Sequence, residues 1–405
     1  NGALWTGIAM AAWVYHYVAA VRENNNTDRD YALSVIQRMI HGMSMMMIVP
    51  NGGLGPDYGG ILARGWAGPE HRDICPYIFD EGIRYFNGSG NYKDYRWRGY
   101  TSNDEYGGYY MGLALALKFI PDPYVQTTVK LIIEQLANYM LLTNFLGISG
   151  PGGPSGVNQK AKFMGGAFWV ATLLKMASIV NPEKYEEKYY HWLSSELYVL
   201  ATNEGGEQET LANYYAFNFA HCVVFAYLLL EGIESPAGKV FYDAYLRGLR
   251  NITQYHRNAW FNVIYLAIAS KPGDNPIIER DIEDQLMRLD INHFPDRYYG
   301  HEPIPADTPI VDIEGMQREF FENRGWGYLY SIPFVEFNWD HEYFTRPLTV
   351  DYHNTGNLMW EHSPFRNSSS EVNILKEMPG TTFTVPYWIM RAYGYIGTSG
   401  IREAL

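Results

Sequence analysis

The sequence predicts an all-α fold, and three observations carry this prediction. Apolar residues recur at helical spacing in a long series of segments. Proline or glycine follows most of these segments, as is typical of helix ends. No run of clearly alternating polar and apolar residues, the pattern of a half-buried strand, separates a pair of them.

The expected helices follow from this pattern in chain order. They cover residues 5–23, 29–48, 104–120, 124–145, 163–180, 183–201, 209–230, 238–255, 259–269, 276–289 and 386–395. The breaks between successive helices are the polar residues 24–28, Pro121 with Pro123, Pro182, Gly232 with Pro236, and Pro272 with Gly273.

The links between the helices alternate in length. Links after the odd helices are short, whereas most links after the even helices are long, at residues 49–103, 146–162 and 290–385. Long loops in compact domains are usually functional. Helical hairpins joined in this way would close into a double-layered α/α barrel, with the long loops gathered over one face.

In this barrel the inner helices would begin at Trp5, Asp104, Phe163, Glu209, Ala259 and Pro386. Small residues would let them pack closely, namely Gly107, Gly108, Gly112, Gly165 and Gly166. We expect one domain over residues 1–405, with residues 290–384 as a loop-rich insertion over the barrel mouth. Short strands are possible within residues 327–337.

Composition narrows the range of partners. Apolar residues make up 47% of the chain and charged residues 19%, so the chain is expected to be globular. The net charge of −13 argues against nucleic acid and against anionic membrane surfaces. No uninterrupted apolar run approaches the roughly 20 residues that span a bilayer, so no membrane span is expected.

Other features favour a secreted protein. The sequence opens almost directly into a helix at Asn1, as expected of a processed chain. Asn-x-Ser/Thr sequons occur at Asn25, Asn87, Asn251 and Asn367, so these are predicted glycosylation sites. Cys75 is expected in a loop and Cys222 within a helix, either as free thiols or as one disulfide.

Several motifs resemble those of a known group. They are Gly-Ile-Leu-Ala-Arg-Gly-Trp at residues 60–66, Tyr-Arg-Trp-Arg-Gly-Tyr-Thr-Ser-Asn-Asp at 95–104, and Arg-Asn-Ala-Trp-Phe-Asn at 257–262. Up to about residue 270 the chain resembles the six-hairpin (α/α)6 toroids of many glycoside hydrolases and some polysaccharide lyases. The motifs look most like secreted bacterial proteins of that build that have no firm function. The resemblance implies a carbohydrate-active protein but specifies no reaction.

Glycoside hydrolysis needs two carboxyl groups that flank one bond, about 5 to 9.5 Å apart. Asp104 is the first catalytic candidate, because arginines precede it and tyrosines follow it at the start of a helix. Asp57 and Glu207 are the candidates for its partner. The alternative is structural: Ser102 and Glu105 fit a capping box, in which Asp104 only favours the helix dipole.

Arginines and aromatic residues interleave beside Asp104. Aromatic rings stack on pyranose rings, and arginine binds carboxylates or sulfates with two hydrogen bonds. The predicted substrate-binding residues in this region are Arg64, Trp66, Arg96, Trp97, Arg98, Tyr106 and Tyr109. Such a set suits an acidic polysaccharide, although arginine stacked on tryptophan is also a common way to hold a loop together.

A polysaccharide lyase needs different groups, namely a cation or amide that neutralises a uronate carboxylate and a His or Tyr base. His256 is the catalytic candidate for this chemistry, with Arg257 and Asn258 as substrate-binding residues and Tyr255 or Tyr106 as possible partners. Asn213 and His221, about two helical turns apart, form a second such pair. The structural alternatives are a buried core histidine at 221 and a loop or capping residue at 256.

No cofactor or metal is expected. The sequence lacks paired His or Cys at metal-ligand spacing, and its glycine-rich stretches follow helices rather than opening them. The leading function is therefore a secreted glycoside hydrolase acting on a polysaccharide, with a lyase as the alternative. A third possibility is a non-catalytic extracellular glycoprotein that self-associates into a surface layer, sheath or filament.

Overall fold

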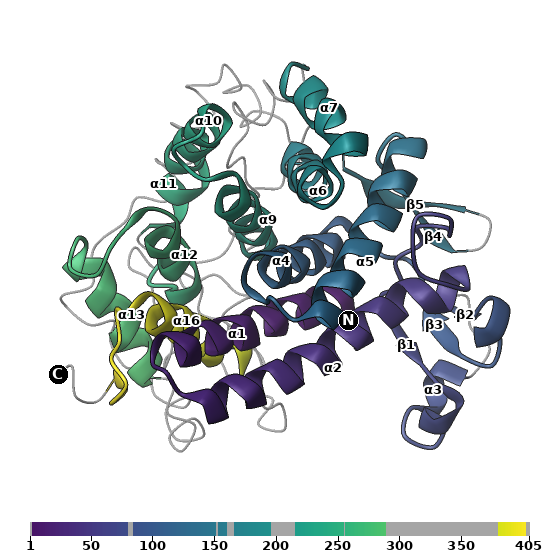
Figure 1. The fold of residues 1–405 in the computed structure, drawn as a ribbon, viewed down its shortest axis with the longest axis horizontal. Coiled ribbons are helices and arrows are strands. Elements are labelled where there is room, and N and C mark those ends of the chain that lie inside the picture. Colours follow the sequence, from purple (N-terminus) through teal and green to yellow (C-terminus); the bar gives the residue numbers. More distant parts are fainter. Residues whose placement is uncertain are drawn as a thin grey trace, which may run out of the picture. The chain divides into compact units, whose positions relative to one another are not determined.

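The computed structural model describes residues 2–79, 84–150, 153–159, 166–195, 215–254, 256–288 and 380–401. These residues are mostly helical, which confirms the predicted all-α class (Figure 1). The chain divides into two compact units. Unit 1 comprises Asn1–Thr202 and Cys222–Phe241, and unit 2 comprises Asn203–His221 and Tyr242–Leu405.

Unit 1 holds the first helices of the chain. They are α1 (Gly2–Arg22), α2 (Asn26–Asn51), the short α3 (Pro76–Phe79), α4 (Asn103–Phe119), α5 (Pro123–Leu142), α6 (Gly166–Val180) and α7 (Pro182–Leu193). Short 3-10 turns cover Pro69–His71 and Gly90–Tyr92. The helix α9 (Tyr215–Glu231) crosses from unit 2 into unit 1, and α10 (Pro236–Tyr245) crosses back.

Unit 2 continues α10 with a π-helical turn, Leu246–Arg250, and a last short piece, α11 (Asn251–Thr253). It then holds α12 (Ala259–Ala269), α13 (Pro276–Arg288) and α16 (Thr381–Tyr393). Within the unit, α12 packs against both α13 and α16. The Tyr395 hydroxyl adds a hydrogen bond of 3.2 Å to the Leu266 carbonyl.

Local sequence accounts for the helix ends. The side chains of Asn25, Asp122, Asn181 and Asn258 each accept a backbone N–H in the first turn of α2, α5, α7 and α12. In α5 and α7 the capping residue precedes a proline, whose fixed φ suits the first helical position. At the other end of α2, Gly52 adopts φ 83°, a left-handed conformation that suits glycine.

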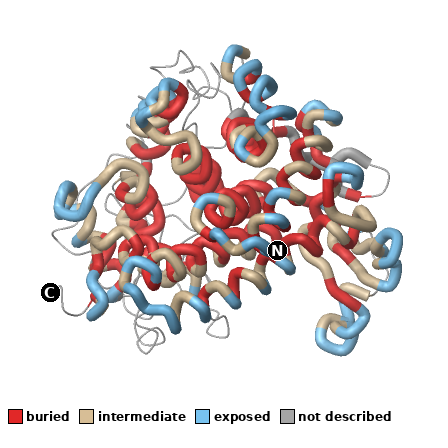
Figure 2. Tube along the Cα trace, viewed as in Figure 1, coloured by how far each residue is buried: buried red, intermediate tan, exposed pale blue. Residues whose placement is uncertain are grey.

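Backbone-to-backbone contact joins α1 and α4, which lie side by side in unit 1. A Cβ on Gly7 would overlap the Gly108 carbonyl, and a Cβ on Gly108 would overlap the Leu4 carbonyl. One turn on, a Cβ on Gly112 would lie 2.8 Å from Gly7 Cα. The expected close packing at Gly108 and Gly112 is therefore present, and most of both helices is buried (Figure 2).

Two small sheets, which the sequence pattern did not predict, lie in the loops of unit 1. The first has the order β1 (Gly65–Ala67), β3 (Arg96–Arg98), β2 (Tyr85–Asn87), and all its pairs are antiparallel. The second is the hairpin of β4 (Leu146–Gly150) and β5 (Gly153–Asn158). Each strand of the first sheet has three residues, too few for alternation to be recognised.

Hydropathy singles out the first two helices. Among the described residues, α1 and α2 are each long and apolar enough to cross a membrane, and a signal sequence would meet the same test. Both helices also pack against other helices of unit 1, α1 against α4 and α2 against α5. The expected absence of a membrane span stays a prediction.

The predicted inner helices can be compared with the observed starts. Four predicted starts, Trp5, Asp104, Ala259 and Pro386, lie within or at the start of α1, α4, α12 and α16. The predicted starts Phe163 and Glu209 lie outside the described residues, as does the insertion at residues 290–384. Closure into an (α/α)6 barrel stays a prediction, and so does a single domain over the whole chain.

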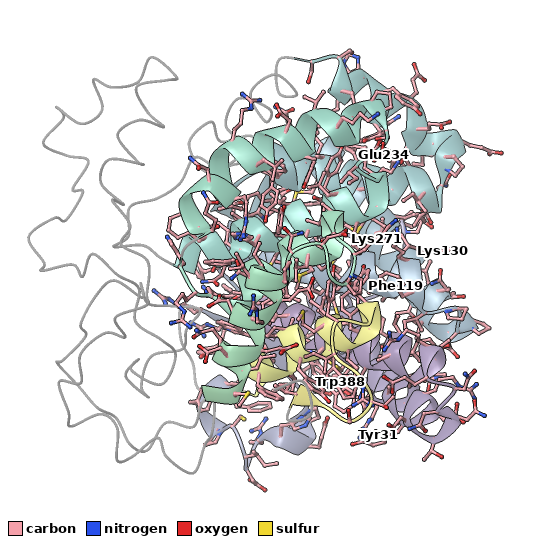
Figure 3. All side chains as sticks on the ribbon, turned by 90° about the vertical axis from the view of Figure 1, so that its left-hand side faces the viewer. Tyr31, Phe119, Lys130, Glu234, Lys271 and Trp388 are labelled. Atoms are coloured by element: carbon pink, nitrogen blue, oxygen red, sulfur yellow. The ribbon has the colours of Figure 1, made fainter. Side chains whose placement is uncertain are left out.

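Side chains cover the helices of both units (Figure 3). Exposed residues such as Tyr31 on α2 and Lys130 on α5 lie on the surface of unit 1. The candidate site residues from the sequence lie elsewhere, mainly around the first turn of α4 and beside the start of α12.

Candidate functional site

The first turn of α4 places two adjacent carboxyl groups in different surroundings. Ser102 is the capping residue by backbone conformation, but its side chain makes no capping hydrogen bond. Glu105 does not fold back to complete a capping box either. Its carboxylate instead bonds to Leu4 of α1 and to Arg64, the residue before β1, so the capping-box interpretation of this stretch is wrong.

Glu105 is fully buried and has two strong partners. Its Oε2 accepts the Leu4 N–H at 2.8 Å, and its Oε1 accepts Arg64 Nε–H at 3.0 Å. Burial raises the pKa of Glu105, whereas the Leu4 N–H and the Arg64 charge oppose that rise. The carboxylate therefore caps the start of α1 and holds Arg64.

Arg64 joins several elements of unit 1. Its backbone N–H donates to the Arg98 carbonyl at 2.8 Å, and its own carbonyl accepts the N–H groups of Gly2 and Ala3. Its Nη1 donates to the Tyr100 carbonyl at 3.3 Å. The Arg64 guanidinium thus holds α1, α4 and the loop at Tyr100, and its predicted role in binding substrate stays a prediction.

Asp104, next to Glu105, is half-buried and reaches solvent. Within the described part of the chain, its carboxylate has no hydrogen bond or ion pair. Its charge contributes to the raised pKa of Glu105, after the larger effect of burial, so the two carboxyl groups lie near each other. Of the two carboxyl groups, Asp104 is therefore the one in contact with solvent, whereas Glu105 is buried.

Neither of the two predicted carboxyl partners of Asp104 is seen in contact with it among the described residues. Asp57 is exposed in the turn that begins at Gly55, and the described contacts include none between Asp57 and Asp104. Glu207 lies outside the described residues.

The predicted cations and tryptophans of the sheet mostly hold the sheet itself. Trp97 is 1% exposed, and its indole N–H donates to the Asn87 carbonyl at 2.9 Å. Arg96 donates to Asn87 Oδ1 and to the Ile78 carbonyl. Trp97 cannot stack on a substrate sugar from this position, so its predicted binding role is wrong.

Trp66 and Arg98 remain at the edge of this region. The Trp66 indole donates to the Gly42 carbonyl at 3.0 Å, which ties β1 to α2, while its ring stays half-buried. Arg98 pairs directly with Gly65 and Tyr85 in the sheet and is half-buried. Neither is excluded from contact with a ligand.

Tyr106 and Tyr109 were predicted to bind substrate, and the structure buries both. The Tyr109 hydroxyl donates to the Met43 carbonyl at 2.8 Å. Burial raises the pKa of both phenols well above the usual value. They are core residues of unit 1, and their predicted binding role is corrected.

The start of α12 in unit 2 holds the residues expected of a lyase. Arg257, in a left-handed conformation with φ 51°, donates from Nε to Asp281 at 2.9 Å and from Nη2 to Asp284 at 2.5 Å. Asn258 is buried and caps α12 by accepting the Trp260 N–H at 3.0 Å. His256 is 1% exposed. The predicted substrate-binding role of Arg257 and Asn258 and the catalytic role of His256 are therefore corrected to structural ones.

A buried polar network extends from this point. Arg250, at the end of the π-helical turn, donates to Asn262 Oδ1 at 2.7 Å, and Asn262 donates to Asp281 Oδ2 at 2.8 Å. Arg250 also lies over the Tyr265 ring at 4.6 Å. The two arginines balance the two aspartates, so the network needs no further ion. Sequence reasoning missed it, although Asp281 and Asp284 share a face of α13.

We expect this network to be structural, and Arg257 provides the test. Arg257→Met should lower the free energy of unfolding by roughly 3 kcal/mol or more, because Asp281 would lose its cation in a mostly buried position. Chemical denaturation measures this change. Arg257→Lys should restore part of it, and Arg280→Met, at an exposed arginine of α13, should change little. Unchanged stability in Arg257→Met would contradict a structural role.

His221 is the other predicted lyase histidine, and it is a core residue. Its ring lies flat on Phe261, with centroids 4.2 Å apart, and its Nδ1–H donates to the Phe217 carbonyl at 2.7 Å. Burial is the main cause that lowers the pKa of His221 to about 3; the hydrogen bond to the Phe217 carbonyl opposes this shift, and the charges of Arg250 and His256 contribute to it. Its suggested partner Asn213 lies outside the described residues, as does Tyr255.

The lowered pKa has a measurable consequence. The unfolded chain binds the His221 proton more tightly than the folded chain does, so protonation favours unfolding. The free energy of unfolding should therefore fall as pH drops from about 6.5 toward 3, by up to about 1.4 kcal/mol per pH unit from this group. His221→Phe should reduce this slope in denaturation curves measured at pH 7 and pH 5. An identical slope in both proteins would contradict the assignment.

The remaining predicted sites are placed as follows. Asn25 and Asn87 are exposed, and Asn251 is half-buried in α11, whereas Asn367 lies outside the described residues. Cys75 and Cys222 are free thiols, so they do not form a disulfide. Among the described residues, no group of three or more His, Cys, Asp or Glu is arranged to hold a metal ion.

Comparisons with known proteins add no relative. No family model, no curated protein and no solved structure matches the chain. The geometry at the start of α4 therefore carries the functional argument.

Proposed function

We propose that the protein is a secreted, carbohydrate-active protein that binds and hydrolyses a polysaccharide at the start of α4. The single observation that carries this proposal is the contrast between Asp104 and Glu105. Glu105 is buried and engaged by Leu4 and Arg64, whereas Asp104 reaches solvent with its carboxylate unengaged by described residues. A carboxyl group fixed by a rigid helix start and open to a ligand suits acid–base chemistry.

Hydrolysis also needs a second carboxyl group at a suitable distance. Glu105 is a poor candidate, because a buried carboxylate bound to an N–H and an arginine has no access to a water molecule or a sugar. Asp57 and Glu207 remain the proposed partners. The substrate is proposed to be an oligo- or polysaccharide, with no nucleic acid partner in view of the net charge of −13.

A lyase receives less support from the geometry of unit 2. Elimination needs a cation that is free to neutralise a uronate carboxylate. Arg257 is instead paired with Asp281 and Asp284, and His256 is buried. The third possibility is a non-catalytic extracellular subunit that self-associates.

A screen against neutral and acidic polysaccharides tests this proposal. We expect new reducing ends without unsaturated products from at least one neutral or acidic substrate. Unsaturated uronate products would favour the lyase and contradict hydrolysis. Regular polymers of the purified protein, with no product from any substrate, would favour the assembly subunit.

A further inference from the structure

Tyr100, between β3 and α4, holds an unusual backbone conformation with an exposed ring. Its φ is 58°, in the left-handed region, and 49% of the residue is exposed. A residue with a Cβ loses roughly 1 to 2 kcal/mol in this conformation relative to the right-handed one. Such strain persists only where the surroundings enforce it, and it is common at functional sites.

The surroundings of Tyr100 do enforce it. On one side, the Gly99 N–H donates to the Arg84 carbonyl at 2.9 Å. The Tyr100 carbonyl itself accepts Arg64 Nη1 at 3.3 Å, and Glu105 holds Arg64. The ion pair of Arg64 and Glu105 therefore helps to hold the backbone of Tyr100, while its ring lies beside that of Phe86.

The next residue is held as well. The Thr101 hydroxyl donates to the Leu62 carbonyl, and both residues are buried. Within unit 1, Tyr100 is thus an exposed ring on a clamped, strained backbone, four residues before Asp104. Four residues of chain span at most about 14 Å, a distance that a short oligosaccharide covers.

Tyr100 differs from the other described residues that adopt the left-handed backbone conformation. Besides glycine, the left-handed residues are Asn24, Tyr100, Asn144, Phe145 and Arg257. Asparagine tolerates this conformation, Phe145 is buried, and Arg257 is paired with two aspartates. Among them, Tyr100 is the residue with a large aromatic side chain that is half-exposed, and its ring lies near that of Phe86, with centroids 6.4 Å apart.

We propose that Tyr100 is the platform on which a pyranose ring of the saccharide stacks, beside Asp104. The flat apolar face of a phenol matches the C–H face of a pyranose, and its hydroxyl stays free to bond a sugar hydroxyl. Arg64 and Glu105 are then positioning residues, which keep this ring in place without touching the sugar. The inference rests on the proposed saccharide-binding function.

Tyr100→Gly separates binding from folding, because glycine relieves the strain while it removes the ring. We expect its melting temperature to rise or stay unchanged. We expect its affinity for a bound oligosaccharide, measured by titration calorimetry in the inactive Asp104→Asn background, to fall roughly tenfold or more. Tyr100→Trp should retain the affinity. If the glycine variant fails to fold, Tyr100→Asn provides the same test, since asparagine tolerates the left-handed conformation.

Two control variants accompany it. Asn24→Gly also introduces glycine at a residue in the left-handed conformation, in the turn between α1 and α2. Tyr124→Ala removes another exposed tyrosine. Neither should change the affinity. Unchanged affinity in Tyr100→Gly would overturn the proposed stacking of the sugar on Tyr100. If Asp104→Asn nevertheless loses turnover, the proposed hydrolase function stands without Tyr100. A wild-type protein that neither binds nor cleaves any saccharide would overturn both.

Discussion

Asp104→Asn should lower turnover of a polysaccharide substrate by about 100-fold or more, because the amide cannot exchange the proton that acid–base catalysis needs. The melting temperature should change little, since Asp104 makes no hydrogen bond or ion pair with a described residue. The measurement is kcat on the responsive polysaccharide together with thermal unfolding of the same preparation.

Asp94→Asn is the matched control, at an exposed carboxyl group of the same long loop. It should keep wild-type turnover and stability. Full activity in Asp104→Asn would remove Asp104 from the catalytic site. Equal losses in both variants would indicate a general effect of charge on the loop rather than a catalytic role.

Gly7→Ala should produce a large loss of stability, about 3 kcal/mol or more in the free energy of unfolding. The new Cβ would overlap the Gly108 carbonyl, and backbone on both sides leaves α1 and α4 no side chain that can move aside. Chemical denaturation measures the change.

Gly42→Ala is the control for this substitution. Gly42 lies within α2, and a Cβ there would meet nothing within 4 Å. Alanine at this position should raise the free energy of unfolding by roughly 0.5 to 1 kcal/mol, because it favours the helix more than glycine does. A similar small effect from Gly7→Ala would mean that α1 and α4 are further apart than the structure places them.

The helices could be predicted from sequence because their signals are local. Prolines and capping residues such as Asp122 with Pro123 and Asn181 with Pro182 mark helix starts in the sequence itself. The three-residue strands around Trp97 are too short to show an alternating pattern. They form because segments distant in the chain pair with them. Their existence therefore depends on tertiary contact that the sequence pattern does not contain.

The candidate site was predictable in part. The interleaved arginines and aromatic residues mark the loop-to-helix junction at Asp104 as a candidate site in the sequence itself. Their individual roles were not, because whether Trp97 or Tyr106 faces the core depends on the sheet register and on the packing of α4. Glu105 illustrates the same limit: its partner Leu4 lies 101 residues earlier, beyond the reach of any capping rule.

The central claim is that a saccharide binds at the first turn of α4. A crystal structure of Asp104→Asn with a bound oligosaccharide tests it most directly. The account predicts a sugar ring stacked on Tyr100, with a glycosidic oxygen within hydrogen-bond distance of the residue 104 side chain. A saccharide bound elsewhere in the protein, with Tyr100 and residue 104 facing only solvent, would contradict it.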